Sequence, residues 1–296
     1  MKVFEFTKKR KISYCISALL IVASIIAFFV QGLNVGIDFK GGTVIQVRMS
    51  EQYTDETIRD VLADVGIQSG AEVQQSEGDY YVRTEELTQE QMDNFSVALQ
   101  ETDATAQILS MESVGAAIGS ELTRNAIFSV LLAAVLMLIY ISFRFELSYG
   151  IAAVVGILHN VIIVIGIFCI CQFEVNTSFI AGILTVVGYS INDTIVIFDR
   201  IRENVKLRRG EDLSDTVNRS VSQTLNRSIN TVLTSIFPLV MLFFMGGSSL
   251  KYFVLVMILG FIIGCYCSIF IASSFWYDLK ERGFGDKRGK SRKRRR

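Results

Sequence analysis

Residues 188–200 read GYSINDTIVIFDR, and they place the acidic side chain of Asp193 inside an apolar segment that begins near Ser178. A carboxylate at the depth of a lipid bilayer is costly, and residues of this kind mark ion or proton paths. The stretch therefore predicts a membrane protein that moves something across the bilayer, or that is driven by something that crosses it.

The composition also indicates a membrane protein. The chain has 296 residues, of which 51% are hydrophobic, and its mean hydropathy is +0.42, which is untypical of a soluble domain. A helix needs about 20 apolar residues to cross roughly 30 Å of hydrocarbon. Six segments meet this requirement, and we predict transmembrane helices at residues 12–31, 125–143, 149–171, 178–199, 229–246 and 252–276.

Charge is unevenly distributed along a chain whose formal net charge is zero. Residues 32–123 contain 17 Asp and Glu but only 4 Lys and Arg, so this region carries −13 and the rest of the chain +13. Short flanks rich in Lys and Arg stay in the cytoplasm. Three segments of this chain are of that kind: its first residues, residues 200–227 with seven Lys and Arg, and residues 280–296 with ten. Six spans place all three on the cytoplasmic side and residues 32–123 outside.

This topology divides the chain into four predicted parts. Residues 1–31 form a cytoplasmic N-terminus and the first transmembrane helix, and residues 32–123 form an exterior domain. Residues 124–277 form a bundle of five transmembrane helices with a cytoplasmic loop at 200–228, and residues 278–296 form a basic cytoplasmic tail. Apolar residues recur every four positions from Leu213 to Ile229, which predicts an amphipathic helix on the cytoplasmic surface before the fifth span.

The exterior region has alternating strand and helix patterns. Strands are predicted at 43–49, 72–75, 80–83 and 107–113, with a hairpin turn at Glu77-Gly78-Asp79. Helices are predicted at 54–65 and 88–99, because apolar residues there recur at helical spacing. The order β-α-β-β-α-β predicts an α+β domain of the ferredoxin-like type.

Two polar stripes predict where an ion could pass. On the fourth span, helical spacing places Asp193 and Tyr189 on one face, with Asn192 about 100° away. On the fifth span, Arg227, Thr231 and Thr234 form a second stripe. Because the two spans are sequential and antiparallel, Asp193 and Arg227 can approach each other. Their separation would favour protonation of the carboxylate and their approach would favour proton release. A static ion pair that only specifies helix packing is the alternative.

No enzymatic chemistry is visible in the sequence. It has no phosphate-binding Gly-Lys-Ser/Thr loop, no nucleophile beside a base and no metal-ligand cluster, so we expect neither an enzyme nor a cofactor. The five cysteines all fall in apolar spans and are interpreted as packing residues. His159, the only histidine, either joins a proton relay or packs in the third span.

The motifs GIDFKGG at 36–42, VGYSIND at 187–193 and NRSINT at 226–231 together resemble those of the SecD/SecF family of Sec accessory subunits. The exterior motif of that family matches GIDFKGG at residues 36–42, which contains Gly36, Asp38, Gly41 and Gly42. The signature of the fourth span in SecF members resembles VGYSIND at 187–193, continuing to FDRIREN at 198–204, which contains Asp199 and Arg200. The fifth span matches NRSINT at 226–231 and FMGG at 244–247. The resemblance covers nearly the whole chain.

The resemblance implies a multi-pass subunit of the bacterial inner or plasma membrane with the fold of the resistance-nodulation-division superfamily. It implies SecD, the Sec translocon channel, an unfolded exported polypeptide and membrane lipid as partners, with no nucleic acid, and use of the proton motive force. By motif position, Asp193 and Arg227 match the family residues implicated in proton movement. Relatives often carry His-Asp where this chain has His159-Asn160, which leaves proton or sodium open. A half-transporter of small molecules or lipids and a non-transporting scaffold are the alternatives.

Overall fold

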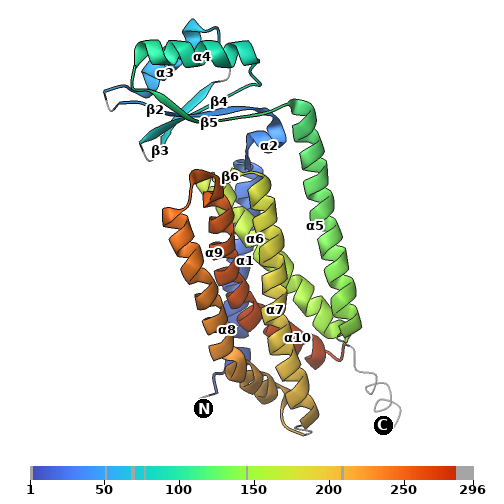
Figure 1. Cartoon of the computed structure of the whole chain (residues 1–296). Helices are drawn as coiled ribbons and strands as arrows, with labels where there is room; N and C mark the ends of the chain where they lie inside the picture. The colour runs from blue at the N-terminus through green and yellow to red at the C-terminus, as the bar shows by residue number, and fades with distance from the viewer. Residues whose placement is uncertain are drawn as a thin grey trace. The chain divides into compact units, whose positions relative to one another are not determined.

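The computed structural model describes residues 3–50, 52–67, 71–76, 78–144, 146–207 and 210–284 (Figure 1). These residues form two compact units, which are described separately. One unit comprises Met1–Asn34 and Ser129–Arg296, and the other comprises Val35–Phe128. Residues 285–296 of the predicted basic tail and Glu77 of the predicted hairpin turn lie outside the described residues.

Six helices of the described chain are long and apolar enough to cross a membrane. They are α1 (Phe6–Val30), α5 (Ala116–Arg144), α6 (Leu147–Cys171), α7 (Thr177–Leu207), α8 (Leu213–Met245) and a last span built from three consecutive pieces. These pieces are α9 (Ser248–Tyr266), a π-helical turn (Cys267–Ala272) and α10 (Ser273–Glu281). All six predicted transmembrane helices are therefore present. Two short strands, β1 (Asn34–Val35) and β6 (Glu174–Val175), complete the elements that flank them.

The segment between the fourth and fifth spans is more helical than predicted. The segment expected to be a cytoplasmic loop, 200–228, is helical to Leu207 and again from Leu213, and the expected surface helix is continuous with the fifth span in α8. Polar side chains join the two helices there: the Asn204 amide donates to Ser220 Oγ at 2.8 Å and to Gln223 Oε1 at 3.0 Å. These bonds pair the polar side chains where α7 and α8 face each other. The two helices therefore pack together on either side of a short turn.

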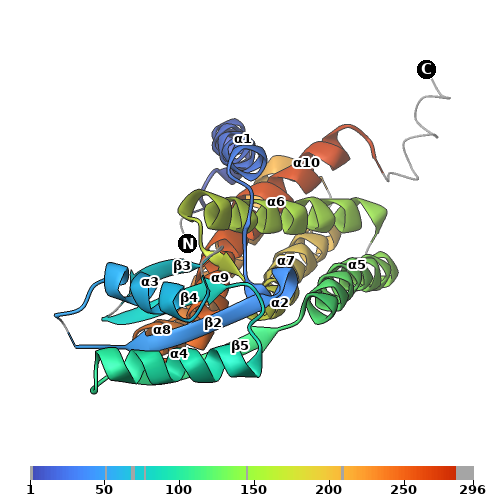
Figure 2. The same ribbon diagram turned by 90° about the horizontal axis from the view of Figure 1, so that it is seen from above.

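Small residues let α7 and α9 approach closely within the bundle. A β-carbon at Gly260 would lie 2.3 Å from the side chain of Val186, and one at Gly182 would lie 3.0 Å from Val256. The Gly260-x-x-x-Gly264 spacing thus serves close helix contact. Figure 2 shows α7 and α9 next to each other inside the bundle, with α1, α6 and α10 gathered on one side.

The second unit is a four-stranded antiparallel sheet with two helices on one face (Figure 1). Its elements are α2 (Ile37–Lys40), β2 (Gly42–Arg48), α3 (Asp55–Asp64), β3 (Glu72–Ser76), β4 (Asp79–Thr84), α4 (Gln89–Thr102) and β5 (Gln107–Val114). The strand order across the sheet is β3-β4-β2-β5, and every neighbouring pair is antiparallel. The predicted order of strands and helices is confirmed, whereas α2 was not predicted.

The core of this unit lies between the sheet and its helices. Ile45 and Val82 of the sheet and Ile58 and Phe95 of the helices are all fully buried. α4 begins with a capping box, in which the Gln91 amide donates to Thr88 Oγ1 and the Thr88 amide donates to Gln91 Oε1, an arrangement that satisfies two unpaired amides of the first turn. Buried and less buried side chains alternate along β2, and α3 and α4 each have one apolar face. These patterns determine which sides of the three elements pack together.

Candidate functional site

Asp193 lies on α7 where this helix faces α8. Its carboxylate is half-buried, and Ser228 Oγ on α8 donates to Asp193 Oδ1 at 2.5 Å. The other oxygen, Oδ2, is buried and finds no hydrogen-bond partner among the described residues. A buried carboxylate with one unoccupied acceptor oxygen is a group that can take up a proton or hold a cation.

A small cavity of about 40 Å³ adjoins this carboxylate. Its walls are Tyr189, Asn192, Asp193, Val196, Arg227 and Thr231. The two polar stripes predicted from the sequence therefore meet at one place. A space of this size exceeds the ~10–15 Å³ that a single water requires, and its walls carry the polar partners that a water needs.

Asp193 and Arg227 line this cavity without forming an ion pair. No nitrogen of Arg227 lies within 4.0 Å of the Asp193 carboxylate in the described chain. Arg227 is exposed, as are Asn192 and Thr231. The direct contact predicted as one state of a gate is replaced here by the hydrogen bond from Ser228.

Tyr189 is fixed from two sides. Its ring stacks on Phe261 of α9, with centroids 4.0 Å apart, and its hydroxyl lies 3.1 Å from Ser235 Oγ of α8. Thr234 does not line the cavity; its hydroxyl donates to the Asn230 carbonyl at 2.9 Å. Tyr189 thus ties α7 to both neighbouring helices next to Asp193.

The π-helical turn brings further hydroxyls close to this position. Ser268 Oγ lies 2.8 Å from Thr194 Oγ1, and both side chains are buried. Thr194 is the residue that follows Asp193. A π turn offsets the helix by one residue and often occurs at functional sites. Sequence reasoning missed both serines: Ser228 fell at the end of the predicted loop 200–228, whereas for Ser268 the available signal was a polar residue inside the predicted span 252–276.

Arg200, from the same family motif, lies in a separate polar cluster. Its Nε donates to Gln223 Oε1 and its Nη1 to Glu203 Oε2, each at 2.6 Å. Asp199 is half-buried two turns beyond Asp193 and does not line the cavity. The second half of the motif therefore joins α7 to α8 and is not part of the cavity wall.

The exterior motif forms a tight structure in the second unit. Gly36 precedes α2, Asp38 lies in its first turn, and Gly41 and Gly42 have φ angles of +78° and +128°. A β-carbon at Gly42 would lie 2.6 Å from the Thr84 carbonyl oxygen. At this position glycine is required both by the backbone conformation and by the lack of space.

Gly119, at the start of α5, faces this motif. A β-carbon at Gly119 would lie 2.9 Å from the carbonyl oxygen of Phe39, and one at Gly41 would lie 3.0 Å from Ala116 Cα. The double glycine thus receives the first turns of the helix that continues into the second span. Gly119 was not singled out in the sequence, because its role depends on a contact with residues about eighty positions away.

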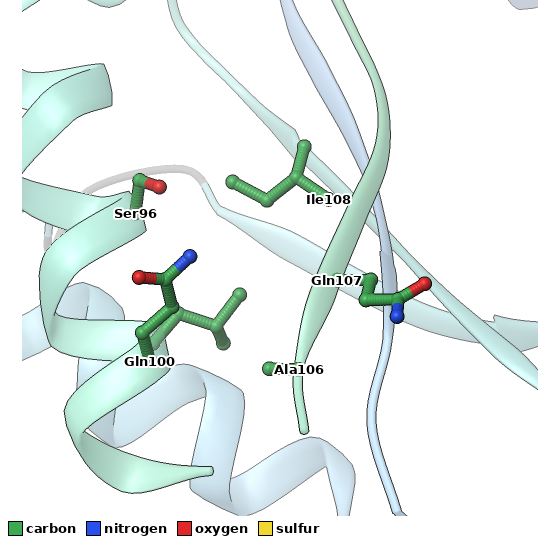
Figure 3. A pocket seen from close by; sticks show the side chains of 6 residues that line it. Ser96, Gln100, Ala106, Gln107 and Ile108 are labelled. Carbon is green, nitrogen blue, oxygen red and sulfur yellow. The ribbon is translucent and has the colours of Figure 1, made fainter. Parts of the chain in front are cut away.

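The second unit also has an open hollow between α4 and β5. It measures about 380 Å³ and is lined by Ser96, Leu99, Gln100, Ala106, Gln107 and Ile108 (Figure 3). The side chains in its wall are neutral. Across the described ranges, no group of three or more His, Cys, Asp and Glu is placed to hold a metal ion.

Comparison with known proteins shows which family has this arrangement. The family "Protein export membrane protein SecD/SecF, C-terminal" matches residues 94–282, and "SecD/SecF GG Motif" matches residues 26–52. The chain belongs to the SecD/SecF family. The "GG" of the second description corresponds to Gly41 and Gly42, where the structure requires glycine.

Individual members of the SecD/SecF family are similar over almost the whole chain. The protein translocase subunit SecF of Sebaldella termitidis is 36% identical, covering 93% of this chain and 92% of that protein. The SecF subunit of Haemophilus influenzae is 39% identical, with coverage of 93% and 86%. The crystal structure of SecDF from Thermus thermophilus, described as a translocon-associated membrane protein, matches with a TM-score of 0.88 and 36% identity. That match covers 95% of this chain and 39% of the SecDF chain.

Proposed function

We propose that this chain is the SecF-type subunit of a protein-export complex and couples a transmembrane ion gradient to the late steps of polypeptide export. A SecD-type subunit is the expected partner, since the chain spans only 39% of the SecDF chain that it resembles. The other proposed partners are the Sec channel, the unfolded exported polypeptide and membrane lipid. The coupling ion is proposed to be the proton.

The observation that carries this proposal is the Asp193 cavity. It combines a half-buried carboxylate, an acceptor oxygen without a partner in the described residues, and a guanidinium in the same wall. Arg227, Asn192 and Thr231 are exposed on spans that cross the membrane. Polar side chains of transmembrane helices avoid lipid, so a second set of spans that covers this face would enclose the carboxylate.

The energy available from one ion is sufficient for such a role. One charge that crosses about 150 mV releases roughly 3.5 kcal/mol, which shifts a two-state equilibrium by a few hundred-fold. Protonation and deprotonation of Asp193 would supply the two states.

The exterior domain is proposed to be ferredoxin-like, at residues 32–123, and to hold the exported chain. Its element order and its sheet order β3-β4-β2-β5 support this assignment. It carries −13 charges, so we expect it to bind an emerging chain through apolar or backbone-pairing surfaces. α5 runs without interruption from Ala116 to Arg144, which provides a covalent helical link from this domain to the second span.

The proposed orientation places both termini in the cytoplasm. The basic segments at the start, between the fourth and fifth spans and in the tail at 278–296 support it. The first span then belongs to residues 1–31 and the other five to residues 124–277.

Gradient-dependent export of a secreted protein tests the proposal. Membrane vesicles would carry the SecD-type partner with wild-type chain, Asp193→Asn or Arg227→Ala. We expect both variants to assemble but to lose the stimulation by the gradient. Asp199→Asn is the matched control, because it changes a carboxylate on the same helix that does not line the cavity.

Two outcomes would contradict the proposal. Gradient-stimulated export by an assembled Asp193→Asn complex would show that the carboxylate is structural, and the chain would then be a scaffold. Uptake of small molecules or lipids that is abolished by Asp193→Asn, with export unchanged, would instead indicate a half-transporter.

A further inference from the structure

A cavity lies between α1, α6, the π-helical turn and α10. Its volume is about 540 Å³, within the ~300–1,000 Å³ typical of ligand sites. Figure 2 shows α1, α6 and α10 next to one another, and no residue that lines this cavity also lines the Asp193 cavity, so the two are separate. We call it the α1–α6–α10 slot. It is lined by Tyr14, Ser17, Ala18, Ile21, Val155, Leu158, His159, Ile162, Ile271, Phe275, Asp278, Leu279 and Arg282.

Hydrocarbon forms most of the wall along the length of the slot. Ile21, Val155, Ile162, Ile271 and Phe275 line it, and none of them carries a polar side-chain group. Leu158 is 54% exposed, so the slot is open along its side to whatever surrounds the bundle. For a chain with six spans, that surrounding is the acyl region of a bilayer.

The end of the slot near the C-terminus of α10 is charged. Asp278 already has partners there: Arg10 Nε forms an ion pair with its Oδ1 at 3.0 Å, and the Tyr14 hydroxyl donates to its Oδ2 at 2.9 Å. Arg282 is exposed at the same end and has no acidic partner in the part of the chain that the structure describes. Arg10 Nη2 also lies 3.6 Å from Glu281 Oε2, so Arg10 pairs with two carboxylates, and Arg282 is left as a cation of this end without an ion pair among the described residues.

The dimensions of the slot match one leaflet of a membrane. Ile271 at the inner end and Arg282 at the charged end are 11 residues apart in sequence, which is about 16 Å along a helix. One leaflet contributes roughly half of the 30 Å hydrocarbon thickness. An acyl chain that begins at an interfacial phosphate would thus end near Ile271.

From this geometry we infer that the slot binds one acyl chain of an anionic phospholipid, with the lipid phosphate at Arg282. The apolar wall matches the chain, the lateral opening provides access from the bilayer, and Arg282 complements the phosphate. In the proposed orientation this lipid belongs to the cytoplasmic leaflet. The inference depends on the membrane placement of the chain and is independent of any role of Asp193.

Water is the competing occupant, and the wall provides little to hold it. A buried water needs two to four polar partners. Ser17 Oγ already lies 3.3 Å from the Tyr266 hydroxyl, and Tyr14 is bonded to Asp278. His159 is 4% exposed, and neither of its ring nitrogens has a partner among the described residues. One imidazole in a long apolar slot does not supply the bonds of a water column.

Photolabelling tests the inference on the full chain. The chain would be reconstituted in phosphatidylcholine vesicles that contain phosphatidylglycerol with a diazirine in its acyl chain, and labelled peptides would be mapped. We expect labels at residues 14–21, 155–162 and 271–279. Ala18→Phe should fill the slot and lower labelling about tenfold, equivalent to roughly two methylenes of lost burial. Leu19→Phe, on the exposed side of α1, is the matched control and should leave labelling unchanged.

A second variant tests the headgroup. Arg282→Gln should reduce the preference for phosphatidylglycerol over phosphatidylcholine by about fivefold, the contribution of one basic residue at the interface, and free inorganic phosphate should not displace the label. The inference fails if Ala18→Phe and Leu19→Phe label equally, or if the three segments remain unlabelled. It also fails if the thiol of a His159→Cys variant reacts with a membrane-impermeant aqueous reagent, because the slot would then be filled with water.

Discussion

Among individual side chains, Ser228 has the most direct contact with the proposed ion site. Its hydroxyl donates to Asp193 at 2.5 Å from a neighbouring helix. Hydrogen bonds to charged groups contribute about 1.5–3 kcal/mol in water-soluble proteins, and polar contacts between transmembrane helices contribute about 0.6 kcal/mol on average. The pair should therefore show measurable coupling.

We expect a double-mutant cycle of Ser228→Ala and Asp193→Ala to give a coupling energy of about 1–2 kcal/mol. Unfolding of the full chain in mixed micelles would provide the four free energies. Thr185→Ala combined with Asp193→Ala is the control cycle and should be additive, because Thr185 bonds only the Ala181 carbonyl of its own helix. Additive effects of Ser228 and Asp193 would show that the bond is not formed in the membrane.

Asp103 is one of the carboxyl groups that make the second unit sensitive to acid. It accepts hydrogen bonds from the Thr105 hydroxyl at 2.6 Å and from the Ser50 amide at 3.0 Å. These bonds, that of the Thr105 hydroxyl foremost, lower the pKa of Asp103 to about 2. The carboxyl has a pKa of about 3.9 when unfolded. Its contribution to stability is therefore complete above about pH 4 and is lost as the pH falls through about 2.

Asp103→Asn should remove this part of the acid sensitivity. We expect amide exchange at residues 99–106 of the full chain to become less dependent on pH between about 4 and 2. Glu101→Gln, an exposed change on the same helix, should keep the wild-type profile. An unchanged profile in Asp103→Asn would contradict the assignment.

Among helices and strands, the double glycine lies against β4 at Gly42 and against the start of α5 at Gly41. Gly42 and Gly66 both have positive φ, at +128° and +80°, but only Gly42 has backbone within reach of a β-carbon. Gly42→Ala should therefore lower the free energy of unfolding by more than the ~1–2 kcal/mol that backbone strain alone explains, and Gly66→Ala should stay within that range. Chemical denaturation of the full chain measures both.

A substitution at Gly119 tests the contact between α5 and the double glycine without adding backbone strain. The φ of Gly119 is that of an ordinary helix, so an alanine there changes the space that the side chain occupies. Gly119→Ala should improve helix propensity yet increase amide exchange at residues 37–42, because its β-carbon approaches the Phe39 carbonyl. Unchanged exchange at 37–42 would show that α5 does not dock on the double glycine.

Regular elements were predictable from the sequence where a local pattern determines them. The apolar spacing of Ile58, Val61 and Leu62 predicted α3, and the alternation of residues 43–49 predicted β2, because burial of one face depends on neighbours in sequence. The short α2 was missed, since its four residues are held by contacts of Gly41 and Gly42 with distant backbone. Ser228 was missed for the same kind of reason: its importance depends on how α7 and α8 are rotated about their axes.

For the membrane bundle as a whole, the distribution of exposed polar groups indicates a partner. Arg227, Thr231 and Asn192 are exposed along α7 and α8, and Phe237 on α8 is 64% exposed. A second surface, on α1, exposes apolar residues such as Leu19, which is 69% exposed. Lipid can cover the apolar surface of α1, but it offers no hydrogen-bond partners to the polar groups of the α7–α8 face. The α7–α8 face should therefore be covered by the SecD-type spans, and the α1 face should remain in contact with lipid.

A photo-crosslinking amino acid at Phe237 or at Leu19 distinguishes the two faces. In membranes that contain both subunits, Phe237 should crosslink to the SecD-type chain and Leu19 to lipid, because the exposed Asn192, Arg227 and Thr231 of the α7–α8 face are poorly accommodated by lipid. Efficient crosslinking of Leu19 to the partner, with none from Phe237, would place the interface at α1. The Asp193 cavity would then open to lipid, where an exposed Arg227 and a half-buried carboxylate are too costly to persist.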